Sequence, residues 1–146
     1  MGAAESTTVL VTGGAGYIGS HAAKALRKAG HRVVIYDNLS AGHREAALGA
    51  PLIEGDTSDV ETMRRAIRES GATAVMHFAA WLSVPDSVRD PAGYYRNNVT
   101  GTIGTLEAMA AEGCRQFVFS STCAVYGEPV ETPLSEAHPT APVNAY

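Results

Sequence analysis

Short apolar runs alternate along this chain with longer stretches in which apolar residues recur every three or four positions. The short runs are rich in branched and aromatic residues, a pattern typical of strands that are buried on both faces. We expect five such strands, at residues 8–13, 32–37, 51–56, 73–80 and 115–122. Because helical stretches separate them, the pattern predicts an α/β fold with a doubly wound parallel sheet.

The longer stretches predict helices. The first covers residues 16–29, and Gly30 supplies its stop signal. The second opens at "SDVE" (58–61), where Ser58 is placed to cap the helix and Glu61 to reach back to the cap.

A third helix is expected from about Pro91 to Glu112, since proline is favoured in a first helical turn. Beyond residue 122 the sequence is broken repeatedly by proline, which predicts loop and extended structure there. These residues are Pro129, Pro133, Pro139 and Pro142.

Length and charge narrow the class of protein. At 146 residues the chain fits one domain, which we place at residues 9–146 behind a short extension of residues 1–8. A net charge of −4 and the lack of a basic run argue against nucleic acid or a membrane surface as partner. No apolar run is long enough to predict a bilayer span. Cys114 and Cys123 are too few for a disulfide scaffold or a zinc site, so no metal and a reduced, cytoplasmic setting are predicted.

The candidate chemistry lies at the strand ends, because ligands of doubly wound folds bind beside the carboxyl ends of the strands. The first strand ends in "TGGAGYIGS" (12–20), which contains Gly13, Gly16 and Gly19. Residues without a Cβ allow a tight turn and let a pyrophosphate rest on the amides of a helix N-terminus. The pattern follows a predicted strand and opens a predicted helix. A Rossmann-like dinucleotide site is therefore favoured over glycines that only make a tight turn.

Acidic residues end the next two strands. Asp37 ends the second, where a carboxylate would accept hydrogen bonds from the ribose hydroxyls of an adenosine and repel a 2′-phosphate, which favours NAD over NADP. Asp56 ends the third, and two interpretations stay open. It could bond an adenine amino group, or it could cap the helix that follows.

The fourth and fifth strands end in residues of mixed character. His77 lies within an apolar strand, where a core histidine with satisfied hydrogen bonds is favoured over a general base. Trp81 and Leu82 either line a pocket or pack against the fold. The hydroxyls of "SST" (120–122) would lie near the nicotinamide half of a dinucleotide. Tyr146 is the last residue, and a phenol, with a pKa of about 10, is a poor base unless a nearby cation lowers that pKa.

Seven segments, in order and at fitting intervals, resemble the extended short-chain dehydrogenase/reductase family, and within it the 4-epimerases of UDP-sugars. They are "VTGGAGYIGSH" (11–21), "DNLS" (37–40), "EGD" (54–56), "HFAA" (77–80), "YYRNNVTGT" (94–102), "FSSTCAVYG" (119–127) and "PVNAY" (142–146). The similarity covers nearly the whole chain from Val9 onward. Such an ordered set is far more specific than a single glycine motif.

The resemblance implies a role for each matching residue. The glycine turn would hold the pyrophosphate of NAD, Asp37 and Asn38 the adenosine ribose, and Asp56 with Thr57 the adenine. The segment after the fourth strand would run along the cofactor, with an asparagine of the long helix nearby. The implied cofactor contacts are Gly13, Gly16, Tyr17, Ile18, Gly19, Asp37, Asn38, Asp56, Thr57, Phe78, Ala79, Ala80, Asn98 and Ser120.

For catalysis the resemblance implies Thr122, in the place of the family's catalytic Ser/Thr, and Tyr146, the first residue of its Tyr-x-x-x-Lys motif. Tyrosinate takes the proton of the sugar's 4-hydroxyl while hydride passes from C4 to NAD. The 4-keto sugar then turns over, and hydride returns to its opposite face. The implied activity is C4 epimerisation of a UDP-hexose (UDP-glucose/UDP-galactose), with UDP-xylose/arabinose or UDP-N-acetylhexosamine left open as the substrate.

The sequence departs from the family at two places. Related nucleotide-sugar 4,6-dehydratases carry an Asp-Glu pair after the catalytic threonine, and Cys123 and Ala124 stand here instead, which disfavours dehydration. The motif lysine and a substrate-binding C-terminal domain are absent from these residues, so we expect the N-terminal portion of an epimerase, inactive alone. The parent is expected to be a homodimer that binds a UDP-sugar. A stand-alone NAD-binding module is the alternative to an enzyme.

Overall fold

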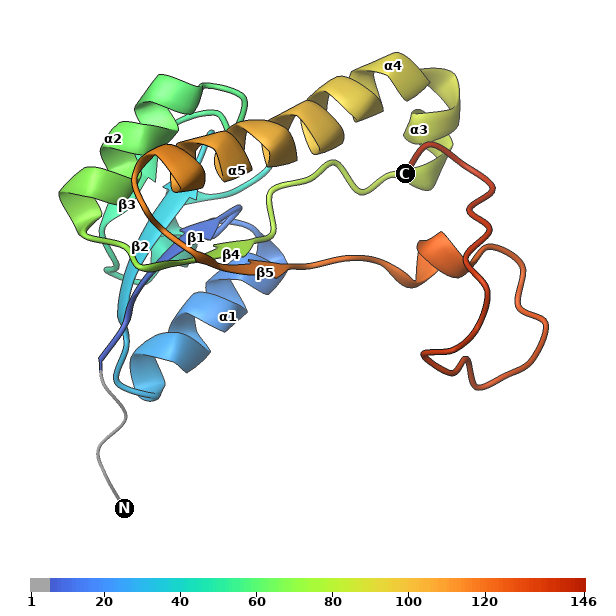
Figure 1. Cartoon of the computed structure of the whole chain (residues 1–146), viewed down its shortest axis with the longest axis horizontal. Helices are drawn as coiled ribbons and strands as arrows, with labels where there is room; N and C mark the ends of the chain where they lie inside the picture. Colours follow the sequence, from blue (N-terminus) through green and yellow to red (C-terminus); the bar gives the residue numbers. More distant parts are fainter. Residues whose placement is uncertain (1–5) are drawn as a thin grey trace.

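The computed structural model describes residues 6–146, and its sheet has the predicted architecture (Figure 1). In this part of the chain five parallel strands pair: β1 (Thr8–Thr12), β2 (Arg32–Asp37), β3 (Leu52–Glu54), β4 (Ala74–His77) and β5 (Gln116–Phe119). Their order in the sheet is β3-β2-β1-β4-β5. Strands β2 and β3 are thus added on one side of β1 and strands β4 and β5 on its other side, so the strand order reverses between β1 and β4. This confirms the Rossmann-like doubly wound fold. Residues 1–5 of the predicted extension 1–8 lie outside the described residues.

Several strands end earlier than their apolar runs. β4 ends at His77 and β5 at Phe119, although the runs continue for a few residues more. Register explains the ends: Thr12 pairs with Tyr36 on one side and with His77 on the other, and His77 pairs with Phe119. The strands therefore end level, and the residues that follow leave the sheet at its carboxyl edge.

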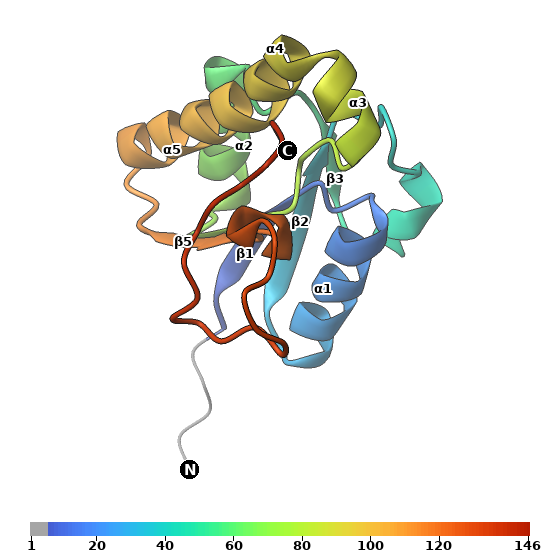
Figure 2. The ribbon, with the colours of Figure 1, turned by 90° about the vertical axis from the view of Figure 1, so that its right-hand side faces the viewer.

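Helices cover both faces of the sheet (Figures 1 and 2). α1 (Tyr17–Lys28) lies on one face, and α2 (Val60–Ser70) and α5 (Gly101–Ala111) lie side by side on the other. Leu10 belongs to the core on the α2–α5 side, whereas its neighbour Val11 belongs to the core on the α1 side. Because successive strand residues face opposite layers, both must be apolar, which accounts for the continuous apolar runs.

The predicted cap of α2 is wrong by one residue. Asp59 is the N-cap, since its Oδ1 accepts from the Thr62 amide at 3.0 Å and its Oδ2 from the Thr62 hydroxyl at 2.7 Å. Ser58 bonds within the preceding turn, and Glu61 pairs with Arg64 instead of reaching back. A carboxylate satisfies a free amide and also opposes the positive end of the helix dipole, so it is the better cap.

The predicted helix 91–112 exists, but it is not regular. α4 (Pro91–Tyr94), a π-helical segment η2 (Tyr95–Thr100) and α5 follow one another without a break. π-Helical turns are rare and occur mostly near functional sites. This segment contains Asn98, one of the residues implied to lie at the cofactor.

Three short elements were not predicted. They are η1 (Arg44–Ala47), α3 (Val84–Arg89) and η3 (Cys123–Tyr126). α3 does have a local start signal, because the Ser83 hydroxyl accepts from the Asp86 amide at 3.3 Å and a proline stands in the first turn. Its six residues are too few to show apolar periodicity. Apart from η3, the chain after residue 122 is loop and extended structure, as expected.

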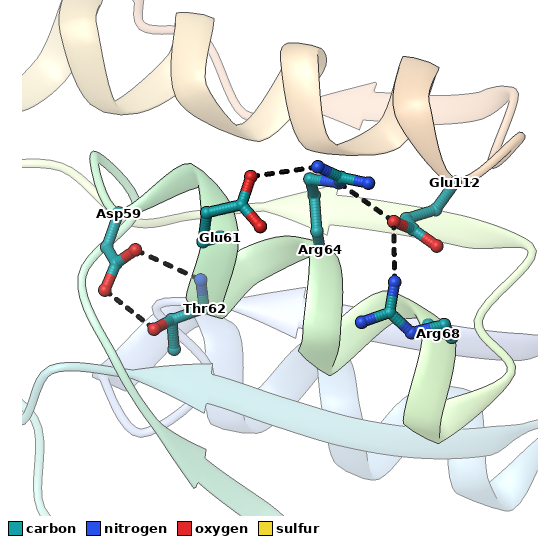
Figure 3. A network of polar contacts seen from close by, with 6 residues as sticks. All are labelled: Asp59, Glu61, Thr62, Arg64, Arg68 and Glu112. Carbon is teal, nitrogen blue, oxygen red and sulfur yellow. Dashed lines mark hydrogen bonds and ion pairs between the residues drawn. The ribbon is translucent and has the colours of Figure 1, made fainter.

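Charged side chains join α2 to the end of α5 (Figure 3). The Glu112 side chain is 11% exposed and accepts from Arg64 Nε at 2.9 Å and from Arg68 Nη1 at 3.1 Å. Arg64 Nη1 also pairs with Glu61 at 2.9 Å. Two guanidinium groups on one mostly buried carboxylate align the helices that form this layer. Within residues 6–146 no helix combines the length and the apolar character that crossing a membrane requires.

Candidate dinucleotide-binding site

The turn between β1 and α1 brings the glycine-rich loop against the segment after β4. Gly13 has a φ of +66°, a conformation that L side chains rarely adopt. A Cβ at this position would lie 2.6 Å from the Ala79 amide nitrogen and 2.7 Å from the Phe78 carbonyl carbon. The Gly13 amide also donates to the Tyr36 carbonyl at 2.9 Å. Gly13 thus joins the ends of three strands at the point where strand order reverses.

Gly16 and Gly19 have different surroundings. A Cβ on Gly19 would collide with the carbonyl of Gly13, so glycine is required there for the turn to pack on the helix. A Cβ on Gly16 would meet only the Gly13 oxygen, at 3.2 Å. The side chains beside it are exposed, Tyr17 by 82% and Ile18 by 57%. A tight turn alone explains Gly13 and Gly19, whereas the open space beside Gly16 suits the close approach of a ligand.

The N-terminus of α1 has the electrostatics of an anion site. Gly16 is its N-cap and makes no side-chain hydrogen bond, and the first turn contains no acidic residue. The amides of that turn are therefore available to a phosphate, and the helix dipole favours negative charge beside them.

Asp37 lies at the carboxyl end of β2 and is tied to the glycine-rich loop. The residue is 8% exposed. Its Oδ2 accepts from the Ala15 amide at 2.9 Å, and its Oδ1 accepts from the Leu39 amide at 2.8 Å. A carboxylate can accept about four hydrogen bonds, so two backbone donors leave acceptor capacity for a hydroxyl-bearing ligand.

Asp56 makes a turn and does not cap α2. Its Oδ1 accepts from the amide and hydroxyl of Ser58 at 2.9 Å and 2.6 Å, and its Oδ2 accepts from Asn38 Nδ2 at 2.9 Å. The hydrogen bonds from Ser58 lower the pKa of the Asp56 carboxyl, so it is an acceptor at neutral pH. Thr57, next to it, lies against the long helix, where its Oγ1 occupies the space that a Cβ on Gly101 would need. The interpretation of Asp56 as the cap of the following helix is therefore wrong.

Asn98 holds the segment that follows β4. Its Oδ1 accepts from the Trp81 amide at 2.8 Å, and its Nδ2 donates to the Trp81 carbonyl at 3.1 Å. The Trp81 ring packs edge-on against Tyr94 with centroids 5.4 Å apart. Trp81 and Leu82 line a hollow of about 470 Å³ together with Ala80, so Trp81 both packs against the fold and lines a pocket.

His77 is a core histidine, as predicted. It is 2% exposed, and both ring nitrogens have threonine partners: Nδ1 lies 2.8 Å from Thr12 Oγ1 and Nε2 lies 3.1 Å from Thr102 Oγ1. Burial lowers the pKa of His77 from 6.5 to about 4. The imidazole is therefore neutral at physiological pH and is enclosed away from any substrate.

The residues implied in catalysis lie beyond β5. The Ser120 amide donates to the His77 carbonyl at 3.1 Å, which extends the strand edge by one bond. Thr122 caps η3, because its Oγ1 accepts from the Ala124 amide at 3.2 Å. Among the described residues no hydrogen bond joins Thr122 to Tyr146. The end of the chain, marked C, lies beside the segment between β4 and α3 in both views (Figures 1 and 2).

The arrangement of these segments is that of a known protein family. The NAD dependent epimerase/dehydratase family matches residues 9–146. The chain belongs to this family. The similarity to UDP-sugar 4-epimerases inferred from seven segments is confirmed: a UDP-glucose 4-epimerase of Azospirillum brasilense is 51% identical over 144 residues, which are 98% of this chain and 41% of that protein.

Further members of the epimerase/dehydratase family are similarly close. A probable UDP-arabinose 4-epimerase of Oryza sativa subsp. japonica is 46% identical over 150 residues, 96% of this chain and 36% of that protein. The crystal structure of UDP-glucose 4-epimerase from Brucella ovis in complex with NAD is similar to this chain with a TM-score of 0.93 and 45% sequence identity. The match covers 97% of this chain and 43% of the Brucella ovis chain. The chain therefore spans about two fifths of the length of these epimerases.

Pattern reasoning missed the residues that support Asp37. The amides of Ala15 and Leu39 hold its carboxylate, and the His43 amide donates to the Ala15 carbonyl at 3.0 Å. Gly42 allows the loop after β2 to lie this close to Ala15, because a Cβ on Gly42 would lie 2.9 Å from the Ala15 backbone. Glycine in the polar loop after β2 was the available signal, although its meaning depends on a loop conformation that local sequence does not specify.

Proposed function

We propose that this chain binds NAD at the carboxyl edge of its sheet. The observation that supports this most directly is the hydrogen bond of 2.9 Å between Asp37 Oδ2 and the Ala15 amide. The acid that holds the ribose is thereby fixed to the loop that holds the pyrophosphate. A buried carboxylate here also repels a 2′-phosphate, which favours NAD over NADP.

The residues present fit such a cofactor. The space beside Gly16 admits a pyrophosphate, and an ionised Asp56 accepts a hydrogen bond from an adenine amino group. Ala79 and Ala80 present little bulk along the path from the glycine loop toward β5. Tyr17, Ile18, Asn38, Thr57, Phe78 and Ser120 complete the proposed cradle. The Brucella ovis relative in complex with NAD supports the assignment.

For the protein to which this sequence belongs, we propose C4 epimerisation of UDP-glucose and UDP-galactose through a 4-keto sugar. NAD, when bound, supplies the acceptor and donor of hydride. Tyr146 takes the proton of the 4-hydroxyl and returns it. Thr122 donates a hydrogen bond to the reacting oxygen: because its Oγ1 already accepts from the Ala124 amide at 3.2 Å, its hydroxyl hydrogen remains to be donated.

Pentoses are a second class of candidate substrate. The relative in Oryza sativa, a probable UDP-arabinose 4-epimerase, keeps pentose substrates among the candidates. A stand-alone NAD-binding module is the second candidate function, since the proposed cradle lies wholly within residues 13–120. A UDP-sugar as substrate, a homodimer and a cytoplasmic location are proposed for the parent on its family membership and cysteine content.

The decisive test is calorimetric titration of the cofactor-free 146-residue chain with NAD⁺ and with NADP⁺. We expect saturable binding of NAD⁺ and binding of NADP⁺ at least about tenfold weaker, the discrimination that one repelled phosphate gives. Asp37→Ala should weaken NAD⁺ binding, and Asp37→Asn should narrow the gap to NADP⁺ because it removes the charge but keeps an acceptor.

The matched control is Glu107→Ala, which removes an exposed carboxylate from α5 and should leave both affinities unchanged. Unchanged NAD⁺ affinity in Asp37→Ala would refute the assignment of the ribose site. A folded, cofactor-free wild type that binds neither dinucleotide would refute the proposal that this chain holds NAD.

A further inference from the structure

A chain of hydrogen-bonded polar groups runs from β1 to the long helix, buried at Thr12 and His77 and partly buried at Thr102 and Asn98. Thr12, which is 0% exposed, lies with its Oγ1 2.8 Å from Nδ1 of His77. On the other side of the ring, Nε2 lies 3.1 Å from Oγ1 of Thr102, and that hydroxyl lies 2.7 Å from the carbonyl of Asn98. Thr12, His77 and Thr102 are not among the implied cofactor contacts, whereas Asn98, which contributes its backbone carbonyl to this chain, is one of them.

The hydrogen bonds of this chain run in one direction. A carbonyl only accepts, so Thr102 gives its single hydroxyl hydrogen to Asn98. Its oxygen must then accept from His77, which places the imidazole proton on Nε2. Nδ1 is left as the acceptor, and Thr12 donates to it. Each member is satisfied in only this order, and the lowered pKa of about 4 keeps the ring neutral and the order intact.

The chain ends on the residue that holds the lip of the hollow. Asn98 binds both the amide and the carbonyl of Trp81, at 2.8 Å and 3.1 Å, and its Oδ1 also accepts from Asn97 Nδ2 at 2.8 Å. Asn98 lies in the π-helical segment Tyr95–Thr100. An irregular turn of this kind needs tertiary contacts to persist, and it has one on each side: Trp81 and, through Thr102, His77.

We propose that His77 and Thr102 are positioning residues that fix Asn98, and through it the Trp81 segment, and so set how tightly the site holds a dinucleotide. This inference rests on the proposed NAD site and adds residues that do not touch the cofactor. A hydroxyl lost at position 102 leaves His77 Nε2–H without a partner and frees the π-helical turn that aims Asn98.

Trp81 makes the inference testable without any ligand. It is the single tryptophan of the sequence, so intrinsic fluorescence reports directly on the segment that Asn98 holds. Thr102→Val removes the hydroxyl at nearly constant shape, and Thr102→Ser restores it. Thr105→Val is the control, because Thr105 also lies on α5 and its hydroxyl donates to the Gly101 carbonyl at 3.0 Å without a link to His77, and since Thr105 is 0% exposed the control removes a hydroxyl at least as enclosed as that of Thr102.

We expect Thr102→Val to shift the Trp81 emission and to weaken NAD⁺ binding by up to about tenfold, the effect of losing one partly buried hydrogen bond. Thr102→Ser and Thr105→Val should match the wild type in both measurements. If Thr102→Val and Thr105→Val behave alike in both, the inference is wrong. If neither the wild type nor any variant binds NAD⁺, the proposed function fails. The Trp81 emission still decides in that case whether Thr102 positions the segment.

A measurement on the unaltered chain covers the case in which Thr102→Val does not fold. Long-range ¹H–¹⁵N NMR of the imidazole distinguishes the two neutral tautomers. A proton on Nε2 of His77 is expected from the order of hydrogen bonds, and a proton on Nδ1 would overturn it.

Discussion

At the scale of single residues, His77 determines how the fold responds to acid. Its pKa is about 4 in the folded chain against 6.5 when exposed, because burial disfavours the charged ring. Between these values the unfolded chain binds more protons than the folded one. The free energy of unfolding should therefore fall as the pH is lowered from 6.5 to 4, by about 3 kcal/mol in total if this group acts alone.

Urea unfolding at a series of pH values measures this dependence. His77→Gln should flatten the acid limb, since the titrating group is gone, whereas His43→Gln should not, because His43 is exposed. An acid limb of equal slope in wild type and His77→Gln would assign the effect to other groups.

Residues also show where local sequence stops being informative. Asp37 was identifiable because an acid directly after a buried strand and a glycine-rich turn is a pattern with a known geometric meaning. Its partners were not identifiable. The Ala15 and Leu39 amides reach it only once the loop after β2 folds over the glycine turn, and that loop conformation depends on Gly42 touching Ala15.

At the scale of elements, the cap of α2 is the clearest difference between pattern and structure. "SDVE" fits a capping box that begins at Ser58, yet Asp59 accepts the Thr62 amide and hydroxyl. Asp59→Ala should lower the melting temperature by a few degrees, the usual effect of losing an N-cap. Ser58→Ala should change it less, because the Ser58 hydroxyl bonds only Asp56.

Thermal melts followed by circular dichroism compare the two variants. A larger loss in Ser58→Ala than in Asp59→Ala would return the cap to the position that the sequence pattern predicts.

Whether the other elements could be predicted from the sequence depends on their composition, their length and the contacts that hold them. The strands were predictable because each faces two apolar layers, so its composition alone marks it. α3 was not, since its six residues complete less than two helical turns and leave periodicity unreadable. The π-helical turn of the long helix could not be predicted either, because it is held by contacts to Trp81 and His77 that lie far away in sequence.

At the scale of the whole molecule, the reversal of strand order between β1 and β4 brings the glycine loop, Asp37 and the Trp81 segment to one edge. These parts come from β1–α1, β2 and β4, so a ligand bound there ties three segments of the sheet together. Such a ligand binds the folded chain and not the unfolded one, and linkage then requires it to stabilise the fold.

The 146-residue chain should therefore melt at a higher temperature with NAD⁺. At a free concentration of about 100 times the Kd the stabilisation is about 2.7 kcal/mol, which for a chain of this size raises Tm by about 5–10 °C. NADP⁺ at the same concentration should raise it less, and Asp37→Ala should show a smaller rise with NAD⁺ than the wild type does. Because the effect depends on occupancy of the whole edge, Thr102→Val should need a higher NAD⁺ concentration to reach the same rise. An equal rise with NAD⁺ and NADP⁺, retained in Asp37→Ala, would mean that the stabilising ligand binds elsewhere on the molecule.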